Sequence, residues 1–315
     1  MNNTHITMNS KLLTYALSAL LFVFPVHFVF IFLKNLLYDF GVLKGEKVGA
    51  KVISIGNISL GGTGKTPITI AIANFLEKKG YSVGIVTRGH GRDNISNSFL
   101  LKNQSWRECG DEVILLKNNT SSNTRIFVSL NKVYAAKQLS KMGCNIILLD
   151  DGFQHRRIDR NIDIVLLGPE NQNKGCQLIY PYGLLREPLC YLKRADITIS
   201  TKNNLIKGIG LKSDHTLELK IKEEVISSGS IKNIHNLCNK SGIVSLCSIG
   251  DPESFSKTLE SININVDKKL VFPDHWPFSL HDVEKINRLS IKEGFEHIVC
   301  TEKDFIKLVE FKNSL

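Results

Sequence analysis

A glycine-rich turn between an apolar strand and a helix constrains the fold of this chain more than any other feature. Residues 55–67 read Ile-Gly-Asn-Ile-Ser-Leu-Gly-Gly-Thr-Gly-Lys-Thr-Pro. Val52–Ile55 has the composition of a strand, and Thr66–Lys79 carries apolar residues at helical spacing. Such a strand, loop and helix bind phosphate, because backbone N–H groups and the positive end of the helix face the anion. The sequence therefore predicts a nucleoside triphosphate site.

The residues of this loop have separate expected roles. Lys65 would reach the β and γ phosphates, and the Thr66 hydroxyl would ligate Mg²⁺. Ser59 stands where the Walker A pattern has its first glycine, a departure for which the next glycines would compensate. A chance glycine-rich turn is the alternative, but it explains neither the strand before nor the helix after. The phosphate-binding residues are predicted to be Gly61, Gly62, Thr63, Gly64, Lys65 and Thr66.

The amino-terminal segment predicts contact with a membrane. Leu12–Leu33 contains 22 residues without Asp, Glu, Lys or Arg, which is long enough to cross the hydrocarbon of a bilayer. Because Pro25 interrupts it, a kinked helix or one lying in the interface is an alternative to a straight span. No small-residue cleavage site follows, so a signal peptide fits less well. Basic residues are more frequent after the segment than before it, which predicts that the rest of the chain faces the cytoplasm.

Net charge and cysteine content limit which classes of binding partner and which compartment this chain is expected to have. The net charge of +10 and pI near 9.2 favour an anionic partner such as nucleic acid, an anionic membrane or a phosphorylated substrate. The apolar segment selects the membrane surface, and we expect no nucleic-acid partner and a monomer. The 7 cysteines form no CxxC pair, so free thiols in a reducing compartment are expected and a structural metal is not.

Strand and helix signals alternate after the glycine loop, which indicates an α/β fold with a P-loop NTPase-like parallel sheet covered by helices on both faces. Residues 202–241 have weak periodicity and predict a domain junction with a few short strands. A second, smaller α/β domain follows, with a helix at Leu280–Glu293 and a strand at His297–Cys300. The expected division is a membrane-associated helix at 1–40, a kinase domain at 41–205 and a smaller domain at 206–315.

Two acidic pairs are candidates for chemistry. Asp150 and Asp151 end the apolar strand Asn145–Leu149, where a P-loop enzyme holds Mg²⁺ opposite the loop threonine. Asp111 and Glu112 precede another apolar run, although acidic residues in a first helical turn are common for the helix dipole alone. Arg88 and Arg92, in a turn with two glycines, could bind an anion or belong to a simple surface turn.

Taken together, the motifs resemble the tetraacyldisaccharide 4′-kinase family over nearly the whole chain. His90, Val113 and Trp276 depart from the Tyr, Pro and His that are common in the family. The resemblance is carried by the apolar amino terminus and by residues 61–67, 88–92, 110–112, 150–155, 185–188, 272–275 and 301–304.

The resemblance implies an enzyme that transfers the γ-phosphoryl group of ATP to the 4′-hydroxyl of a tetraacylated disaccharide 1-phosphate lipid. By the same resemblance, Asp111 is the base that accepts the hydroxyl proton, with His275 as its partner from the second domain. The other implied catalytic residues are Asp150 and Lys65, the other nucleotide-binding residues are His155, Arg186 and Glu187, and the Mg²⁺ ligands are Thr66, Glu112 and Asp151. The cofactors implied are ATP and Mg²⁺.

Two other functions are compatible with parts of the pattern. A membrane-tethered nucleotide switch explains the P-loop, the aspartate pair and the apolar segment, but it gives no role to Asp111 and His275. A soluble P-loop ligase does not need Leu12–Leu33.

Overall fold

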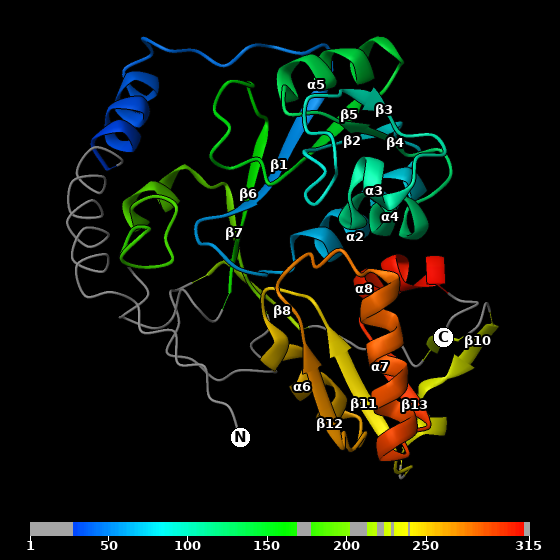
Figure 1. Cartoon of the computed structure of the whole chain (residues 1–315). Coiled ribbons are helices and arrows are strands. Elements are labelled where there is room, and N and C mark those ends of the chain that lie inside the picture. Colours follow the sequence, from blue (N-terminus) through cyan, green and yellow to red (C-terminus); the bar gives the residue numbers. More distant parts are fainter. Residues whose placement is uncertain are drawn as a thin grey trace.

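The predicted alternation of strands and helices forms a large, mostly parallel sheet in the computed structural model (Figure 1). The structure describes residues 28–168, 178–201, 213–218, 224–227, 230–238 and 240–311. In the large sheet, the edge strand β3 runs antiparallel to β4, and the other strand pairs are parallel. In spatial order the strands are β3 (Phe99–Leu100), β4 (Arg125–Val128), β2 (Val83–Thr87), β5 (Ile146–Asp150), β1 (Lys51–Asn57), β6 (Ile162–Leu167), β7 (Ile197–Thr201) and β8 (His215–Leu217).

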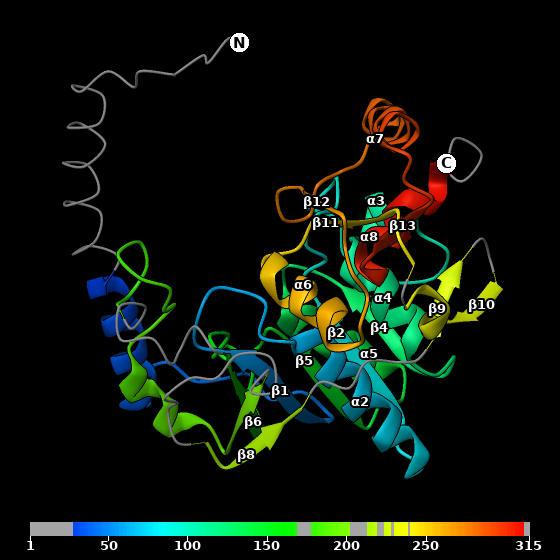
Figure 2. The same ribbon diagram turned by 90° about the horizontal axis from the view of Figure 1, so that it is seen from below.

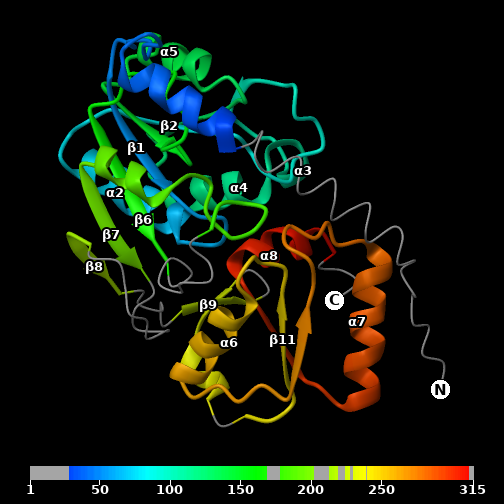
Figure 3. The same ribbon diagram turned by 90° about the vertical axis from the view of Figure 1, so that its left-hand side faces the viewer.

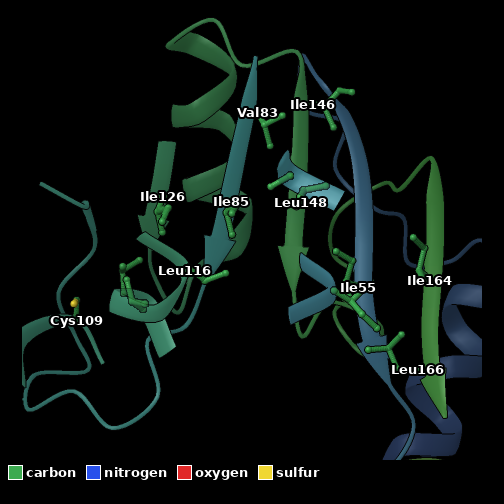
Figure 4. Packing of buried hydrophobic residues seen from close by; sticks show 14 residues of the cluster. Ile55, Val83, Ile85, Cys109, Leu116, Ile126, Ile146, Leu148, Ile164 and Leu166 are labelled. Atoms are coloured by element: carbon green, nitrogen blue, oxygen red, sulfur yellow. The ribbon is translucent and has the colours of Figure 1, made fainter. Parts of the chain in front are cut away.

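Helices cover both faces of this sheet, which is why the central strand β5 is apolar from Ile146 to Leu149. On β5, Ile146 and Leu148 pack in the cluster that includes residues of α2 and α4 (Figure 4), whereas Ile147 and Leu149 pack with α5. Successive side chains of a strand point to opposite faces, so a strand covered on both sides must be apolar at every position. The helices of this part are α2 (Lys65–Lys78), α3 (Trp106–Cys109), α4 (Asp111–Asn119), α5 (Lys132–Lys141) and the 3₁₀ helix η3 (Leu189–Arg194).

A second, three-stranded parallel sheet follows in the order β12, β11, β13. Helix α8 comes after its last strand and packs against α4, so it lies between the two sheets (Figures 1 and 3). The elements of this part are the hairpin β9 (Glu224–Ser227) and β10 (Ser230–Asn233), η4 (Ile234–Leu237), β11 (Ile243–Cys247), α6 (Pro252–Ser261), β12 (Lys268–Val271), α7 (Leu280–Glu293), β13 (His297–Cys300), α8 (Glu302–Leu308) and η5 (Val309–Phe311).

The bounds predicted for α7 and β13 are those of the structure, whereas β3 and α8 were not predicted. Strand β3 and helix α8 are too short for their periodicity to be read from the sequence. The short strands β8, β9 and β10 lie within residues 202–241, where a junction with a few short strands is predicted. Because β8 pairs with β7, the large sheet continues to Leu217, past the boundary expected at 205. The thiols at 109, 144, 190, 238, 247 and 300 are free, and Cys176 lies outside the described residues.

The described end of the apolar amino-terminal segment is helical over residues 28–39 and lies on the opposite side of the molecule from the β9–β10 hairpin (Figure 2). Ile31 and Asn35, one turn apart, are buried, and Ile31 joins a cluster with Ile58 and Phe153. Residues 12–27, most of the predicted membrane segment, lie outside the described part. Among the helices that the structure describes, none has the length and hydropathy needed to cross a bilayer.

The burial of β5 generates a stability prediction. Ile147 is completely buried beneath α5, so Ile147→Ala should lower the free energy of unfolding by about 2–5 kcal/mol through lost burial and a residual cavity. Ile291, 83% exposed on α7, is the matched control. Ile291→Ala should change the free energy of unfolding by less than about 0.5 kcal/mol. Denaturant titration in detergent would measure both; equal effects would contradict the assigned core.

Candidate active site

The candidate residues converge because three parallel strands end at the same edge of the large sheet. β1 leads into the glycine loop, β5 ends at Asp150, and β2 leads into the turn at residues 88–92. These three strands are direct neighbours in the order β2, β5, β1. The carboxyl ends of adjacent parallel strands form the usual ligand-binding edge of such sheets.

The glycine loop has the backbone that its sequence predicts. Gly61 and Gly64 have φ values of 117° and 82°, in a region that side-chain-bearing residues rarely adopt. Ser59, the departure from the Walker A pattern, forms an isolated antiparallel bridge with Leu185. The Thr201 hydroxyl on β7 donates to the Thr63 carbonyl oxygen at 2.9 Å, which anchors the loop to the sheet.

Asp151 is the most strongly paired carboxylate at this edge. Arg186 Nη1 donates to both of its oxygens, at 2.9 and 2.8 Å, and Lys65 Nζ lies 3.7 Å from Oδ1. Burial alone would raise the pKa of Asp151, but Arg186, Lys65 and Lys132 outweigh it and hold that pKa well below its ordinary value. Its φ of 53° is left-handed, which the sequence does not reveal.

Asp150, its neighbour, has the opposite electrostatic character. It is 5% exposed and accepts a hydrogen bond from the Thr87 hydroxyl at 3.0 Å. Burial, reinforced by the negative charge of Glu112, raises the pKa of Asp150 to about 6. Two adjacent carboxylates therefore differ in proton affinity because only one of them is paired with cations through its oxygens.

Lys132 is a buried residue of this site that sequence reasoning missed. Its Nζ donates to the carbonyl oxygens of Asp150 and Asp151, the second at 2.7 Å, and its side chain is fully buried. Burial lowers the pKa of Lys132 to about 8. The available signal was its position at the first residue of α5, where the helix dipole disfavours a cation.

Asp111 and His275 meet across the two sheets. His275 Nδ1 lies 3.0 and 3.1 Å from the two oxygens of Asp111, which is 2% exposed. Burial would raise the pKa of Asp111, but the hydrogen bond from His275 and the charges of Lys303 and Lys307 lower it below its ordinary value. Burial would lower the pKa of His275, and the Asp111 carboxylate reverses this and raises it. His275 Nε2 faces the Lys303 ammonium at 3.1 Å, a contact that only an unprotonated Nε2 can accept, so the geometry favours a neutral ring with its proton on Nδ1.

Glycines allow the two turns around Asp111 to approach each other. A Cβ at Gly110 would lie 2.3 Å from the His90 carbonyl oxygen, and one at Gly91 would lie 3.4 Å from His275 Nδ1. Both glycines also have positive φ. Close packing of these two turns beside His275 thus explains the glycines at 91 and 110. Arg92, the second arginine of the turn, is buried and donates hydrogen bonds to the carbonyl oxygens of Ile95 and Asn97.

Two predicted nucleotide-binding residues have different surroundings. His155 has a buried Nε2 without a hydrogen-bond partner among the described residues, and burial lowers its pKa to about 4, so the ring is a neutral group available to a ligand. Glu187, 2% exposed, accepts hydrogen bonds from Asn35, Gln154 and Arg194 at 3.1, 3.1 and 2.7 Å. Its carboxylate therefore joins the amino-terminal helix to this edge of the sheet, and direct contact with a nucleotide stays a prediction.

The oxygen donors predicted for Mg²⁺ are distributed over three elements. Thr66 lies in the first turn of α2, Glu112 is half-buried on α4 and forms an ion pair with Lys303 at 3.3 Å, and Asp151 follows β5. In the part of the chain that the structure describes, no three acidic, histidine or cysteine side chains form a metal-binding group by themselves. A Mg²⁺ ion held by one or two carboxylates, a hydroxyl and substrate phosphates needs no such group.

Comparison with known proteins identifies the family to which this chain is similar over nearly its whole length. The family model LpxK, described as tetraacyldisaccharide-1-P 4′-kinase, matches residues 17–315. Relatives named tetraacyldisaccharide 4′-kinase include one from Syntrophus aciditrophicus, 34% identical over 92% of this chain and 84% of the relative, and one from Koribacter versatilis, 30% identical over 90% and 86%. The crystal structure of an "apo" form of LpxK from Aquifex aeolicus in complex with ATP is similar with a TM-score of 0.73 and 29% identity, over 92% of this chain and 90% of that one.

The contrast between Asp150 and Asp151 predicts opposite effects of the same substitution. A carboxyl group whose pKa is raised from 3.8 to about 6 on folding costs stability once pH exceeds the unfolded value. Asp150→Asn should therefore raise the free energy of unfolding at pH 8, by on the order of 1–3 kcal/mol, and the gain should vanish below about pH 4. Asp151, whose pKa is lowered, stabilises the fold when ionised, so Asp151→Asn should destabilise it at pH 8.

Denaturant unfolding at pH 4 and pH 8, in EDTA and without nucleotide, would measure both variants. Asparagine tolerates the left-handed backbone of residue 151, so its effect reports the lost charge. The same sign for the two substitutions at pH 8 would contradict this account of the site.

Proposed function

Because this chain belongs to the LpxK family of tetraacyldisaccharide-1-P 4′-kinases, we propose that it phosphorylates the 4′-hydroxyl of a tetraacyldisaccharide 1-phosphate with ATP, giving lipid IVA. The observation that carries this proposal is the hydrogen-bonded pair of buried Asp111 and half-buried His275 near the edge formed by the glycine loop and Asp150–Asp151. A nucleotide switch has no need of such a pair.

The glycine loop and α2 are the expected ATP site. Among the described residues, no side chain caps the amino terminus of α2, and its first turn contains no acidic residue. The N–H groups and positive dipole end of this 14-residue helix are therefore left for an anion. Gly61, Gly62, Thr63 and Gly64 would surround the phosphates with Lys65, and the ATP named for the Aquifex aeolicus structure supports this assignment.

Asp111 is the proposed base for phosphoryl transfer. It would accept the proton of the 4′-hydroxyl while that oxygen bonds to the γ-phosphorus and the bond to the β-phosphate oxygen breaks, leaving ADP. His275 donates from Nδ1 to Asp111 and would orient the carboxylate. Lys65 would offset the charge that develops on the transferred group, and Asp150 would support the γ-phosphate region with His155 and Arg186.

The hard oxygen donors Thr66, Glu112 and Asp151 suit Mg²⁺. Both Asp151 oxygens accept hydrogen bonds from Arg186, so Arg186 would have to move from Asp151 toward the nucleotide when the ion binds. Bound Mg²⁺ would neutralise phosphate charge during transfer.

The three-stranded sheet and its helices are proposed to form a smaller domain that closes on the kinase domain. His275 follows β12, whereas Asp111 begins α4 on the large sheet. Their contact brings the two parts together, and closure of this kind excludes water from the transferred phosphoryl group.

Membrane association is proposed through the amino-terminal helix, at the cytoplasmic face of the inner membrane. The described turns of that helix bury Ile31 and Asn35, and the exposed apolar side chains on them are Phe28, Val29, Phe30, Phe32, Leu33 and Leu37. An apolar surface of this kind suits the acyl region of a bilayer, where the lipid substrate would lie.

Transfer of radiolabelled γ-phosphate from Mg-ATP to a tetraacyldisaccharide 1-phosphate in detergent tests the function. A labelled lipid would support the kinase. ATP hydrolysis that is independent of the lipid, with no labelled lipid, would overturn it in favour of a nucleotide switch.

Asp111→Ala should lower kcat by about 10²- to 10⁴-fold, the usual contribution of a general base, with the KM for ATP little changed. Asp93, exposed in the neighbouring turn, is the control, and its alanine variant should retain wild-type kcat. A kcat for Asp111→Ala close to that of Asp93→Ala would exclude Asp111 as the base.

His275→Ala separates closure from nucleotide binding. We expect its turnover to fall far more than its affinity for ATP, because the nucleotide loop belongs to the other sheet. Turnover from the labelling assay and ATP affinity from equilibrium titration would be compared; equal losses in both would contradict the proposed closure.

A further inference from the structure

Helix α8 carries two lysines toward the Asp111–His275 pair. Lys303 and Lys307 are four residues apart and so lie on one face of the helix, the face that packs near α4. The motif at residues 301–304, to which Lys303 belongs, has no role in the transfer described so far. Lys303 is 14% exposed as a side chain and Lys307 is completely buried.

Lys303 contacts charged or polar groups from both sheets. Its Nζ lies 3.1 Å from His275 Nε2, 3.3 Å from Glu112 Oε1 and 3.6 Å from Asp274 Oδ1. Glu112 belongs to α4, whereas Asp274 and His275 follow β12. One ammonium group therefore bridges the two parts of the chain beside the catalytic pair.

The contact with Nε2 determines which nitrogen of His275 carries the proton. An ammonium group donates hydrogen bonds and accepts none, so Nε2 must present its lone pair to Lys303. The proton of the neutral ring then resides on Nδ1, which faces Asp111 at 3.0 Å. In the other tautomer, Nδ1 would turn a lone pair toward the carboxylate, and the hydrogen bond would be lost.

Lys307 fixes the position of α8 itself. Its Nζ lies 2.9 Å from Asp304 Oδ1 and 3.7 Å from Asp111 Oδ2, and it donates to the Ser248 hydroxyl. Asp304 in turn accepts hydrogen bonds from the Thr301 hydroxyl at 2.7 Å and the Ser248 N–H at 2.9 Å. Lys303 thus extends from a helix held by a buried, hydrogen-bonded ion pair.

We infer that Lys303 is a positioning residue that keeps His275 Nε2 unprotonated, so that the ring stays neutral, donates from Nδ1 and orients the Asp111 carboxylate for the 4′-hydroxyl. The inference rests on the proposed function for its consequence in catalysis, but not for the tautomer itself. The family resemblance alone assigns Lys303 no such role, because the contact depends on the docking of α8 against α4.

The test compares Lys303→Met, which keeps most of the stem and removes the donors, with Lys303→Arg, which can still donate to Nε2. Lys285→Met, an exposed lysine on α7, is the control. Each full-length protein, in detergent, would be labelled with ¹⁵N-histidine and its ring nitrogens observed by NMR without ATP or lipid. The His275 signals are those absent from His275→Asn.

In wild type, Lys303→Arg and Lys285→Met, we expect His275 to show a protonated Nδ1 and an unprotonated Nε2. In Lys303→Met, Asp111 still holds the proton on Nδ1, and Nε2, which no longer faces an ammonium group, should take up a second proton. The positive charge on the ring would make Asp111 a weaker base, so kcat should fall about 10- to 100-fold with the KM for ATP within about 2-fold of wild type. Lys303→Arg should recover most of that kcat.

An Nε2 that stays unprotonated in Lys303→Met would overturn the inference, whether or not kcat falls, because a loss of kcat alone would report a different role for the lysine. A wild-type ring that carries its proton on Nε2 would overturn it as well. If wild type labels no lipid, the proposed function fails, while the NMR comparison still decides the role of Lys303.

Discussion

The hydrogen bond between His275 Nδ1 and Asp111 is the contact on which the arrangement of this site depends. It joins residues 164 positions apart and connects the large sheet to the three-stranded one. The backbone around it is built for close approach, with glycines at 91 and 110 and a left-handed φ of 58° at His275. Strained positions of this kind persist where surrounding packing over-determines them, and they are concentrated at functional sites.

The edge of the large sheet is also a region of closely balanced charge. Asp151 is neutralised by Arg186 and Lys65, whereas Asp150 is buried with a single side-chain hydrogen bond and a raised pKa. The Lys132 ammonium group donates hydrogen bonds to the backbone carbonyl oxygens of both aspartates. Burial that disfavours the ionised form of Asp150 lowers the stability of the fold. Such a loss of stability is typical of sites selected for chemistry.

Contacts also link this edge to the amino-terminal helix. Asn35 of that helix donates to Glu187, which neighbours the Arg186 that binds Asp151. Arg156 donates to the Asn35 carbonyl oxygen at 3.1 Å and forms an ion pair with Asp39 at 2.8 Å. The helix proposed to contact the membrane is thereby fixed to the segment that carries the site, which suits an enzyme whose substrate lies in a lipid leaflet.

The sequence by itself determined the features that are encoded locally. The spacing of apolar residues predicts the strands and helices of the parallel sheet, and the glycine loop with Lys65 and Thr66 predicts the phosphate site, because these depend on the backbone geometry of neighbouring residues. Asp111 and His275 could be paired only through the family resemblance, since nothing in either local sequence indicates the other.

Tertiary structure alone decided the contacts made between distant elements. Lys132 beneath the aspartates, Lys303 and Lys307 beside His275, and the burial of Glu187 under Asn35 all follow from how helices dock on the sheets. A lysine in an exposed helix and a lysine in a buried one have the same local sequence pattern. The two lysines differ in free energy because of burial and because of contacts with residues far along the chain. Burial and these contacts both arise only when the sheets have assembled.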